Sequence, residues 1–245
     1  MKAMIFAAGL GTRLKPMTDI MPKALVPVCG KPLISHVIEK LEAAGIDGFV
    51  VNVHHFADML EEWLSQNRPS VSISDERECL LETGGAILHA RPYLEGNGEF
   101  LIHNVDILSD LDVAGFTAAV RPDAMATLLV SDRKTSRYLL FEPESMRLAG
   151  WMNVSTGEVR SPYEGLAPEK YVALAFSGIH VMSDKVFPLM EEYTQRHGRR
   201  FSVIDFYLEI CCLYDIFGVK IENLNLIDVG KLDTLAAAEE FCRQS

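Results

Sequence analysis

The sequence predicts an α/β protein with a doubly wound, mostly parallel sheet that carries a mixed or antiparallel extension. Over residues 3–130, short apolar runs alternate with amphipathic segments, which is typical of parallel strands joined by helices. After about residue 131, strand-like runs follow one another with only turn residues between them, which favours antiparallel pairing. The composition, 49% hydrophobic and 23% charged, is ordinary for a globular protein. We expect residues 1–245 to form a single domain.

The first half of the chain predicts alternating strands and helices. Short apolar runs predict strands at 3–7, 48–53, 71–74, 100–103 and 125–130. Apolar residues at helical spacing predict helices at 32–44, 56–64, 83–90 and 110–120. Pro32 suits the first turn of one helix and Gly45 suits its end. Asp110 and Asp112 are expected to cap the helix that follows them.

The second half begins with a run of strands. We expect strands at 138–142, 147–152, 158–160, 171–181 and 216–221, with a turn-rich loop at 153–157. Helices are expected at 183–194, 201–214 and 232–242. Pro188 lies inside the first of these, which predicts a kink, and Ser202 is expected to cap the second.

Charge and hydropathy exclude several classes of partner. The formal net charge is −11, which opposes binding to nucleic acid or to an anionic membrane surface. No run of about 18 apolar residues occurs, so no spanning helix is expected. Met1 and Lys2 lead directly into a strand rather than a signal peptide, so we expect a cytoplasmic protein. We also expect a monomer or a small homo-oligomer.

The cysteines and histidines do not indicate a metal site. The five cysteines, at positions 29, 79, 211, 212 and 242, include no C-x-x-C pair, so free buried thiols are expected. His54 and His55 form the one histidine cluster, at the end of a predicted strand. A polar strand end is the better interpretation of that pair.

The first strand leads into the loop Ala8-Gly9-Leu10-Gly11-Thr12-Arg13. Glycines allow successive N–H groups to face one point, and such a concavity binds anions. Arg13 adds a guanidinium suited to phosphate oxygens, and Lys23 follows between prolines that stiffen its segment. The loop is not the dinucleotide fingerprint, since Leu14 stands at the third glycine position, and it is not a Walker A loop. Taken alone, it could equally be a tight turn with two solvated basic residues.

Three further clusters are candidates for chemistry. Gly84 and Gly85 begin a predicted helix, where bare backbone could receive a planar ring, or could simply form a flexible loop. Asp106 follows the strand at 100–103, where ligands of open α/β sheets bind, so it could hold Mg²⁺ or serve as a turn residue. Asp228 precedes Gly230 and the last helix, where a helix cap is the alternative.

The whole amino-terminal pattern resembles that of the sugar-1-phosphate nucleotidyltransferases, also called nucleotide-sugar pyrophosphorylases. The matching stretches are AAGLGTRL-x-Pro at 7–16, Pro-Lys at 22–23, and Pro-Val-x-Gly-Lys-Pro-Leu-Ile at 27–34. The resemblance is strongest over 1–45 and 80–107, and it is clear again at 176–179 and 226–235. It implies a cytoplasmic enzyme that joins a nucleoside triphosphate to a sugar 1-phosphate with Mg²⁺ and releases pyrophosphate. It also implies a nucleotide-binding half at about 1–130 and a sugar-phosphate half at about 131–245.

The resemblance implies roles for individual residues. Arg13 would hold the leaving pyrophosphate, Lys23 would stabilise charge on the α-phosphate, and Asp106, a catalytic residue, would bind Mg²⁺ together with Asp228. The nucleotide would be bound by Ala8, Gly9, Gly11, Thr12, Gly84 and Gly85. Sugar-phosphate candidates are Asn153 and Gly178, although the family's Glu-Lys-Pro segment is replaced here by residues 150–153. Lys231 also departs from the family, which commonly has threonine there.

Within the family, LETGGAI at 81–87 and the chain length are most similar to the short N-acetylmuramate-1-phosphate uridylyltransferase and mannose-1-phosphate guanylyltransferase group. UTP with an amino-sugar 1-phosphate is therefore the expected substrate pair. A guanylyltransferase, a phosphocholine-type cytidylyltransferase and a non-catalytic regulatory protein that binds nucleotide sugars remain alternatives. The base, the sugar and the oligomeric state stay open.

Overall fold

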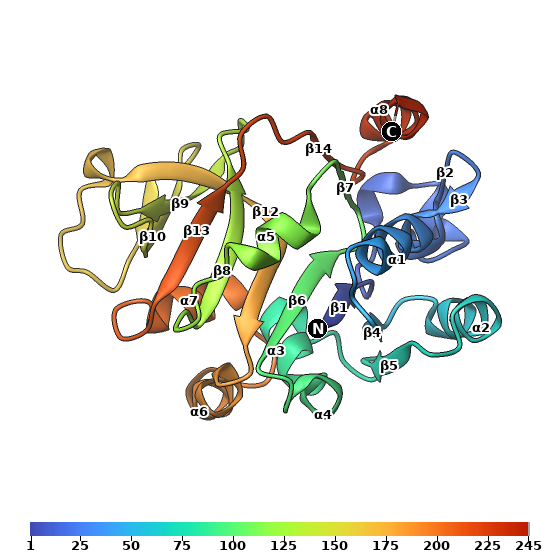
Figure 1. The fold of residues 1–245 in the computed structure, drawn as a ribbon, viewed down its shortest axis with the longest axis horizontal. Coiled ribbons are helices and arrows are strands. Elements are labelled where there is room, and N and C mark those ends of the chain that lie inside the picture. Colours follow the sequence, from blue (N-terminus) through green and yellow to red (C-terminus); the bar gives the residue numbers. More distant parts are fainter. Residues whose placement is uncertain (245) are drawn as a thin grey trace.

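The computed structural model describes residues 1–244 and is built on a central parallel sheet (Figure 1). In spatial order its strands are β5 (Ser72–Asp75), β4 (Gly48–Val53), β1 (Lys2–Phe6) and β6 (Glu99–Asn104). β1 pairs in parallel with β4 on one side and β6 on the other, and β4 pairs in parallel with β5. Their carboxyl ends meet at one edge, as expected for a doubly wound sheet.

β12 (Val172–Ser183) joins this core to the extension. The extension consists of β8 (Ala126–Ser131), β9 (Arg137–Phe141), β10 (Leu148–Asn153), β11 (Glu158–Arg160) and β13 (Ile216–Lys220). β12 lies antiparallel to β6 on one side, and on the other side it pairs antiparallel first with β9 and then with β8. The whole forms one ten-stranded mixed sheet, so the predicted fold class is confirmed.

Helices cover both faces of the sheet because alternate strand residues point to opposite sides. Ala3 and Ile5 of β1 belong to one buried cluster, while Met4 belongs to the other. The first face packs against α1 (Leu33–Ala43), α2 (Ala57–Asn67), α5 (Val113–Ala118) and α8 (Leu232–Gln244). The second packs against α3 (Glu82–His89), α4 (Arg91–Leu94), α6 (Val186–His197) and α7 (Val203–Ile210).

Several short elements were not expected from the sequence. β2 (Pro27–Val28) and β3 (Lys31–Pro32) form a small hairpin, and 3₁₀ turns occupy Thr12–Leu14, Met17–Asp19, Lys23–Leu25 and Pro168–Lys170. β7 (Ile107–Ser109) pairs antiparallel with β14 (Leu226–Asp228). This last pair brings a late segment of the chain against the segment that follows β6.

Several helix ends differ from the expectation by a few residues. α7 ends at Ile210 rather than near residue 214. Pro188 lies in the first turn of α6, where no helical hydrogen bond is lost. Asp112 caps α5 by accepting a hydrogen bond from the Gly115 N–H at 3.0 Å, as expected. The cap predicted for Asp110 is wrong, because its carboxylate instead accepts hydrogen bonds from Asn225.

The cysteines are free, as expected, but the prediction that they are buried is wrong for most of them. Cys211 is buried in the second core, whereas Cys29, Cys79 and Cys212 are exposed in turns or loops. Between residues 1 and 244, no helix combines the length and the apolar character needed to cross a membrane.

Candidate active site

The loop after β1 opens directly into a cleft at the carboxyl edge of the sheet. Gly11 has a φ of 62°, and a Cβ there would lie 2.7 Å from Cγ2 of Thr18. The Thr18 hydroxyl donates to the Gly11 carbonyl at 2.7 Å, which fixes the turn. Gly9, by contrast, has no atom within 4 Å of a Cβ position. Gly11 is therefore required by the turn itself, while Gly9 faces open space that a ligand could occupy.

This cleft has a volume of about 460 Å³ and gathers most of the residues singled out in the sequence. Those that line it are Ala8, Gly9, Gly11, Thr12, Arg13, Lys23 and Asp106. They come from the ends of β1 and β6 and from the 3₁₀ turns after β1. Parallel strands bring such residues together because their carboxyl ends share one edge.

Lys23 and Asp106 form an ion pair in the cleft. The Lys23 ammonium group donates a hydrogen bond to a carboxylate oxygen of Asp106. Their side chains are only 10% and 20% exposed. Pro22 precedes the 3₁₀ turn that contains Lys23. The lysine is thus held in the cleft rather than extended into solvent.

Asp228 lies beside Asp106 through the β7–β14 pair. The Val229 N–H donates to the Asp106 carbonyl at 2.8 Å. Within residues 1–244, the buried Oδ1 of Asp228 has no hydrogen-bond partner. Asp228 itself does not line the cleft, but its neighbour Gly230 does.

Gly230 lets Arg13 approach this carboxylate. A Cβ at Gly230 would lie 2.6 Å from Oδ1 of Asp228 and 2.7 Å from a terminal guanidinium nitrogen of Arg13. Arg13 is exposed and makes no ion pair with any carboxylate of residues 1–244. An available guanidinium and an unpartnered carboxylate oxygen therefore both pack against Gly230.

Gly84 and Gly85 lie behind the cleft wall rather than on it. Their N–H groups both donate to the Phe201 carbonyl, at 2.9 and 3.3 Å. A Cβ at Gly84 would lie 2.3 Å from the Phe201 ring, and one at Gly85 would lie 2.3 Å from the Arg199 carbonyl oxygen. Their neighbours Glu82 and Thr83 line the cleft instead. The glycines are explained by close packing, and their contact with nucleotide stays a prediction.

A second cleft of about 590 Å³ lies over the extension, and Asn153 lines it. The Asn153 Oδ1 accepts a hydrogen bond from the Ser155 N–H at 3.0 Å. Gly178 lines neither cleft, and with a φ of 74° it packs against the Asn104 side chain. The Thr83 hydroxyl oxygen, at the first cleft, accepts a hydrogen bond at 2.9 Å from the N–H of Val203, whose neighbours Ser202 and Ile204 line the second cleft.

The second cleft carries positive charge that the protein does not neutralise. Arg133 and Arg137 line it, are exposed, and have no carboxylate partner in residues 1–244. Arg160 differs, because it pairs with Asp205 and stacks over the Trp151 ring at 4.1 Å. Two arginines thus remain available to an anion.

Two buried residues of the first cleft were missed from the sequence. Asn52 and Glu76 both line it and are 3% and 2% exposed. Burial raises the pKa of Glu76, while hydrogen bonds from Asn52 and from the Leu81 backbone act in the opposite direction. A polar Asn52 inside the apolar strand 48–53 was a signal that could have been used. Glu76 carried no such signal, since it stands in an acidic, turn-like run.

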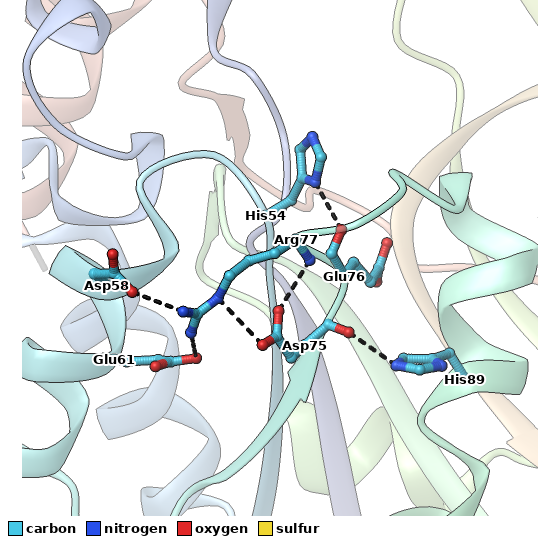
Figure 2. Close-up of polar contacts among 7 residues, drawn as sticks. All are labelled: His54, Asp58, Glu61, Asp75, Glu76, Arg77 and His89. Atoms are coloured by element: carbon cyan, nitrogen blue, oxygen red, sulfur yellow. Dashed lines mark hydrogen bonds and ion pairs between the residues drawn. The ribbon is translucent and has the colours of Figure 1, made fainter.

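The His54 ring is hydrogen-bonded to the Glu76 carbonyl at 2.8 Å (Figure 2).

Across residues 1–244, no three His, Cys, Asp or Glu side chains are grouped so that they could hold a metal ion. Any metal in the first cleft would therefore have at most two protein carboxylates. Mg²⁺ is commonly bound in this way, by one or two carboxylates with phosphate oxygens and water.

Comparison with known proteins identifies the family that this chain resembles. A family model described as "Nucleotidyl transferase" matches residues 2–245. An N-acetylmuramate alpha-1-phosphate uridylyltransferase of Caulobacter vibrioides is 36% identical over 197 residues, which are 75% of this chain and 76% of that protein. One from Neisseria meningitidis is 42% identical over 122 residues, which are 49% of this chain and 51% of that protein.

Solved structures share the fold over nearly the full length. A UDP-glucose pyrophosphorylase complexed with UDP-glucose has a TM-score of 0.76 and is 19% identical. The match covers 99% of this chain and 98% of that one. At this identity the likeness concerns the arrangement of the elements alone.

Proposed function

The chain belongs to the nucleotidyl transferase family and is a sugar-1-phosphate nucleotidyltransferase, and we propose that it joins UTP to the 1-phosphate of an amino sugar. The convergence of the Gly9–Gly11 loop, Arg13, Lys23 and Asp106 in one cleft carries the proposal. The choice of UTP and an amino sugar is supported by the two relatives, which are named as uridylyltransferases acting on N-acetylmuramate 1-phosphate.

The reaction is an in-line displacement at the α-phosphorus. A phosphate oxygen of the sugar 1-phosphate forms the new P–O bond, and the bond from the α-phosphorus to the bridging oxygen breaks. Pyrophosphate leaves with the bonding electron pair. No general base is needed, since the attacking phosphate is already an anion. Catalysis of this kind rests on positioning and on stabilisation of charge.

Arg13 and Lys23 supply the positive charge in this scheme. Arg13, exposed at the rim and without a carboxylate partner in residues 1–244, binds the leaving pyrophosphate. Lys23, held in the cleft, stabilises charge that grows on the α-phosphate. Ala8, Gly9, Gly11 and Thr12 provide the surrounding backbone, with Gly84 and Gly85 supporting the wall near the base.

Asp106 and Asp228 are the proposed ligands of Mg²⁺. Nucleotidyltransferases of this family use a divalent metal ion. The unpartnered Oδ1 of Asp228, whose neighbour Val229 is hydrogen-bonded to the Asp106 backbone, fits such an ion because it is a buried oxygen that needs a positive partner. The metal would supply further charge neutralisation on phosphate oxygens. Before it binds, the Lys23 ammonium neutralises Asp106.

The second cleft is the proposed place for the sugar 1-phosphate. Arg133 and Arg137 offer guanidinium groups suited to an anionic ligand. Asn153 contributes a side-chain amide, and Gly178, packed against Asn104 of the first cleft, is a backbone candidate. The Thr83–Val203 hydrogen bond ties a residue of the first cleft to the segment that places Ser202 and Ile204 on the second.

The proposal is tested by assaying pyrophosphate release from ATP, CTP, GTP and UTP with a panel of sugar 1-phosphates. We expect the highest kcat/KM with UTP and an amino sugar. A tenfold preference for GTP would favour a guanylyltransferase, and CTP with phosphocholine would favour a cytidylyltransferase. Nucleotide-sugar binding without any turnover would favour the regulatory alternative.

Variants of the carboxylates test the metal assignment. Asp106→Asn should abolish turnover, because the metal would lose a charged ligand, while the protein still folds, with stability lowered by the loss of the Lys23 ion pair. Asp112→Asn is the matched control, since asparagine also caps a helix and Asp112 lies outside both clefts. EDTA should stop the wild-type reaction and added Mg²⁺ should restore it. Full activity in EDTA would contradict the assignment.

A further inference from the structure

A chain of three hydrogen bonds crosses the floor of the first cleft through Asn52 and Glu76. The Ala7 N–H donates to Asn52 Oδ1 at 2.7 Å. Asn52 Nδ2 donates to Glu76 Oε1 at 2.8 Å, and the Leu81 N–H donates to Glu76 Oε2 at 3.1 Å. Each of these hydrogen bonds has one donor and one acceptor, so the direction of the hydrogen-bond chain is fixed.

These three hydrogen bonds join two segments that both face the cleft. Ala7 begins the loop that carries Gly9, Gly11 and Arg13. Leu81 immediately precedes Glu82 and Thr83, which line the opposite part of the cleft. The Leu81 carbonyl also accepts a hydrogen bond from the Phe201 N–H at 3.2 Å, so this segment is held from both sides. Asn52 and Glu76 therefore set the spacing between the phosphate loop and the 81–83 segment.

A carboxylate in this position is costly to the fold. Glu76 has no cationic partner among the ion pairs of residues 1–244, and the hydrogen bonds to its carboxylate oxygens come from the Asn52 side-chain amide and the Leu81 backbone N–H. Apolar side chains usually fill a buried strand end with less penalty than an unpaired charge. The two polar residues are also on the cleft wall, where their positions are transmitted to anything bound there.

We propose that Asn52 and Glu76 are positioning residues that hold the phosphate loop and the 81–83 segment at the spacing required by the nucleotide. Neither need touch the reacting atoms. The inference rests on the nucleotide-binding function proposed above. It predicts that disturbing the pair weakens nucleotide binding more than it slows the chemical step.

The direction of the hydrogen bonds provides a reciprocal test. Glu76→Gln places an N–H group against either Asn52 Nδ2 or the Leu81 N–H, whichever way the new amide turns. Asn52→Asp places one carboxylate against another. In the double variant N52D/E76Q, the introduced aspartate accepts from the Ala7 N–H and from the introduced glutamine amide, whose oxygen accepts from the Leu81 N–H. All three bonds and the net charge are then restored.

Arg77→Gln is the matched control. Arg77 follows Glu76 directly, but its guanidinium points the other way, to Asp58, Glu61 and Asp75 (Figure 2). Loss of these ion pairs loosens the same segment without changing the cleft wall. A general loosening of the segment is thereby separated from the proposed spacing effect.

The experiment measures the Kd of Mg–UTP and Mg–GTP by calorimetry, kcat and KM by pyrophosphate release, and unfolding in urea. Glu76→Gln and Asn52→Asp should each raise Kd and KM about tenfold, as expected for a lost hydrogen bond to a charged group. The lost contacts stabilise the bound nucleotide and the transition state equally, so kcat should stay within about threefold of the wild-type value. N52D/E76Q should return to within about threefold of wild type, and Arg77→Gln should bind normally.

Two results would overturn the inference while leaving the proposed function intact. One is a Glu76→Gln enzyme that unfolds more easily but binds nucleotide with unchanged Kd. The other is a double variant no better than the worse single variant. Failure of the wild-type protein to bind either nucleotide would instead refute the proposed function, and the inference with it.

Discussion

Lys23 donates its hydrogen bond to Asp106 inside a cleft where both side chains are shielded from water. Lys23→Ala should therefore lower kcat by about 10²–10³, the usual effect of removing a positioned electrostatic donor. Lys15→Ala is the control, because Lys15 belongs to the same segment but is exposed and pairs only with Asp19. Pyrophosphate release and urea unfolding are measured for both. Unchanged turnover in Lys23→Ala, or a loss fully explained by unfolding, would exclude the assigned role.

Sequence reasoning brought together those residues of the first cleft that stand at the ends of apolar runs. Arg13 and Asp106 could be placed together because a parallel sheet brings strand ends to one edge. Glu76 could not be placed there, since its burial depends on how the segment after β5 folds back beneath Leu81. Gly84 and Gly85 were recognised, but the reason for them, contact with residues 199–201, lies far away in the sequence.

At the scale of elements, β1, β4 and β6 were predicted within a residue or two because each is an apolar run. β7 and β14 were missed. Each has only three residues, too few for a recognisable period, and each exists because it pairs with the other. The pairing that carries Asp228 therefore depends on tertiary structure.

α3 and the segment at 199–201 are in such close contact that one methyl group should disturb them. Gly85→Ala places a Cβ 2.3 Å from the Arg199 carbonyl oxygen, so backbone must move. We expect a loss of about 1–3 kcal/mol in the free energy of unfolding, as for an overpacked core. In Gly48→Ala the nearest atoms belong to the flexible Lys2 side chain, so little loss is expected. Equal stabilities in urea would show that the contact can relax.

α8 and the β2–β3 hairpin are joined by two thiols from opposite ends of the chain. The Cys29 thiol donates to the Glu239 carbonyl of α8 at 3.2 Å, and Cys29 and Cys242 line the same cleft. Diamide should therefore oxidise the two thiols to a disulfide, taking up two electrons and two protons. Peptide mass spectrometry without reductant would detect it. The cross-link should persist in Cys79→Ser and vanish in Cys29→Ser; its absence from wild type would contradict this docking of α8.

The stability of the whole molecule should fall in acid because two histidines are buried without charge. Burial lowers the pKa of His103 to about 4 and that of His180 to about 3. In the unfolded chain both histidines have a pKa near 6.5. Their contribution to the free energy of unfolding is therefore complete above pH 6.5 and is lost as the pH falls toward 4 and 3. The raised pKa of Glu76 has the opposite sign, giving stability below pH 4.5 that is lost as the pH rises.

His180→Phe should reduce the loss of stability that the protein suffers in acid. Both ring nitrogens of His180 lack hydrogen-bond partners in residues 1–244, and the ring contacts Phe176 and Tyr207. Between pH 7.5 and pH 5 the variant should lose about 2 kcal/mol less than wild type in the free energy of unfolding. His55→Gln, outside both cores, should retain the wild-type loss. If urea titrations show the same fall in the free energy of unfolding with pH for all three proteins, the prediction is refuted.

The β7–β14 pair also determines when the site can exist during synthesis. Domains generally fold as units during synthesis. Arg13, Lys23 and Asp106 leave the ribosome long before Asp228 and Gly230 do. Asp228 and Gly230 reach them only after β14 has emerged and paired with β7. A nascent chain halted before residue 226 would therefore present a phosphate loop but no complete site, so catalytic competence arrives late in translation.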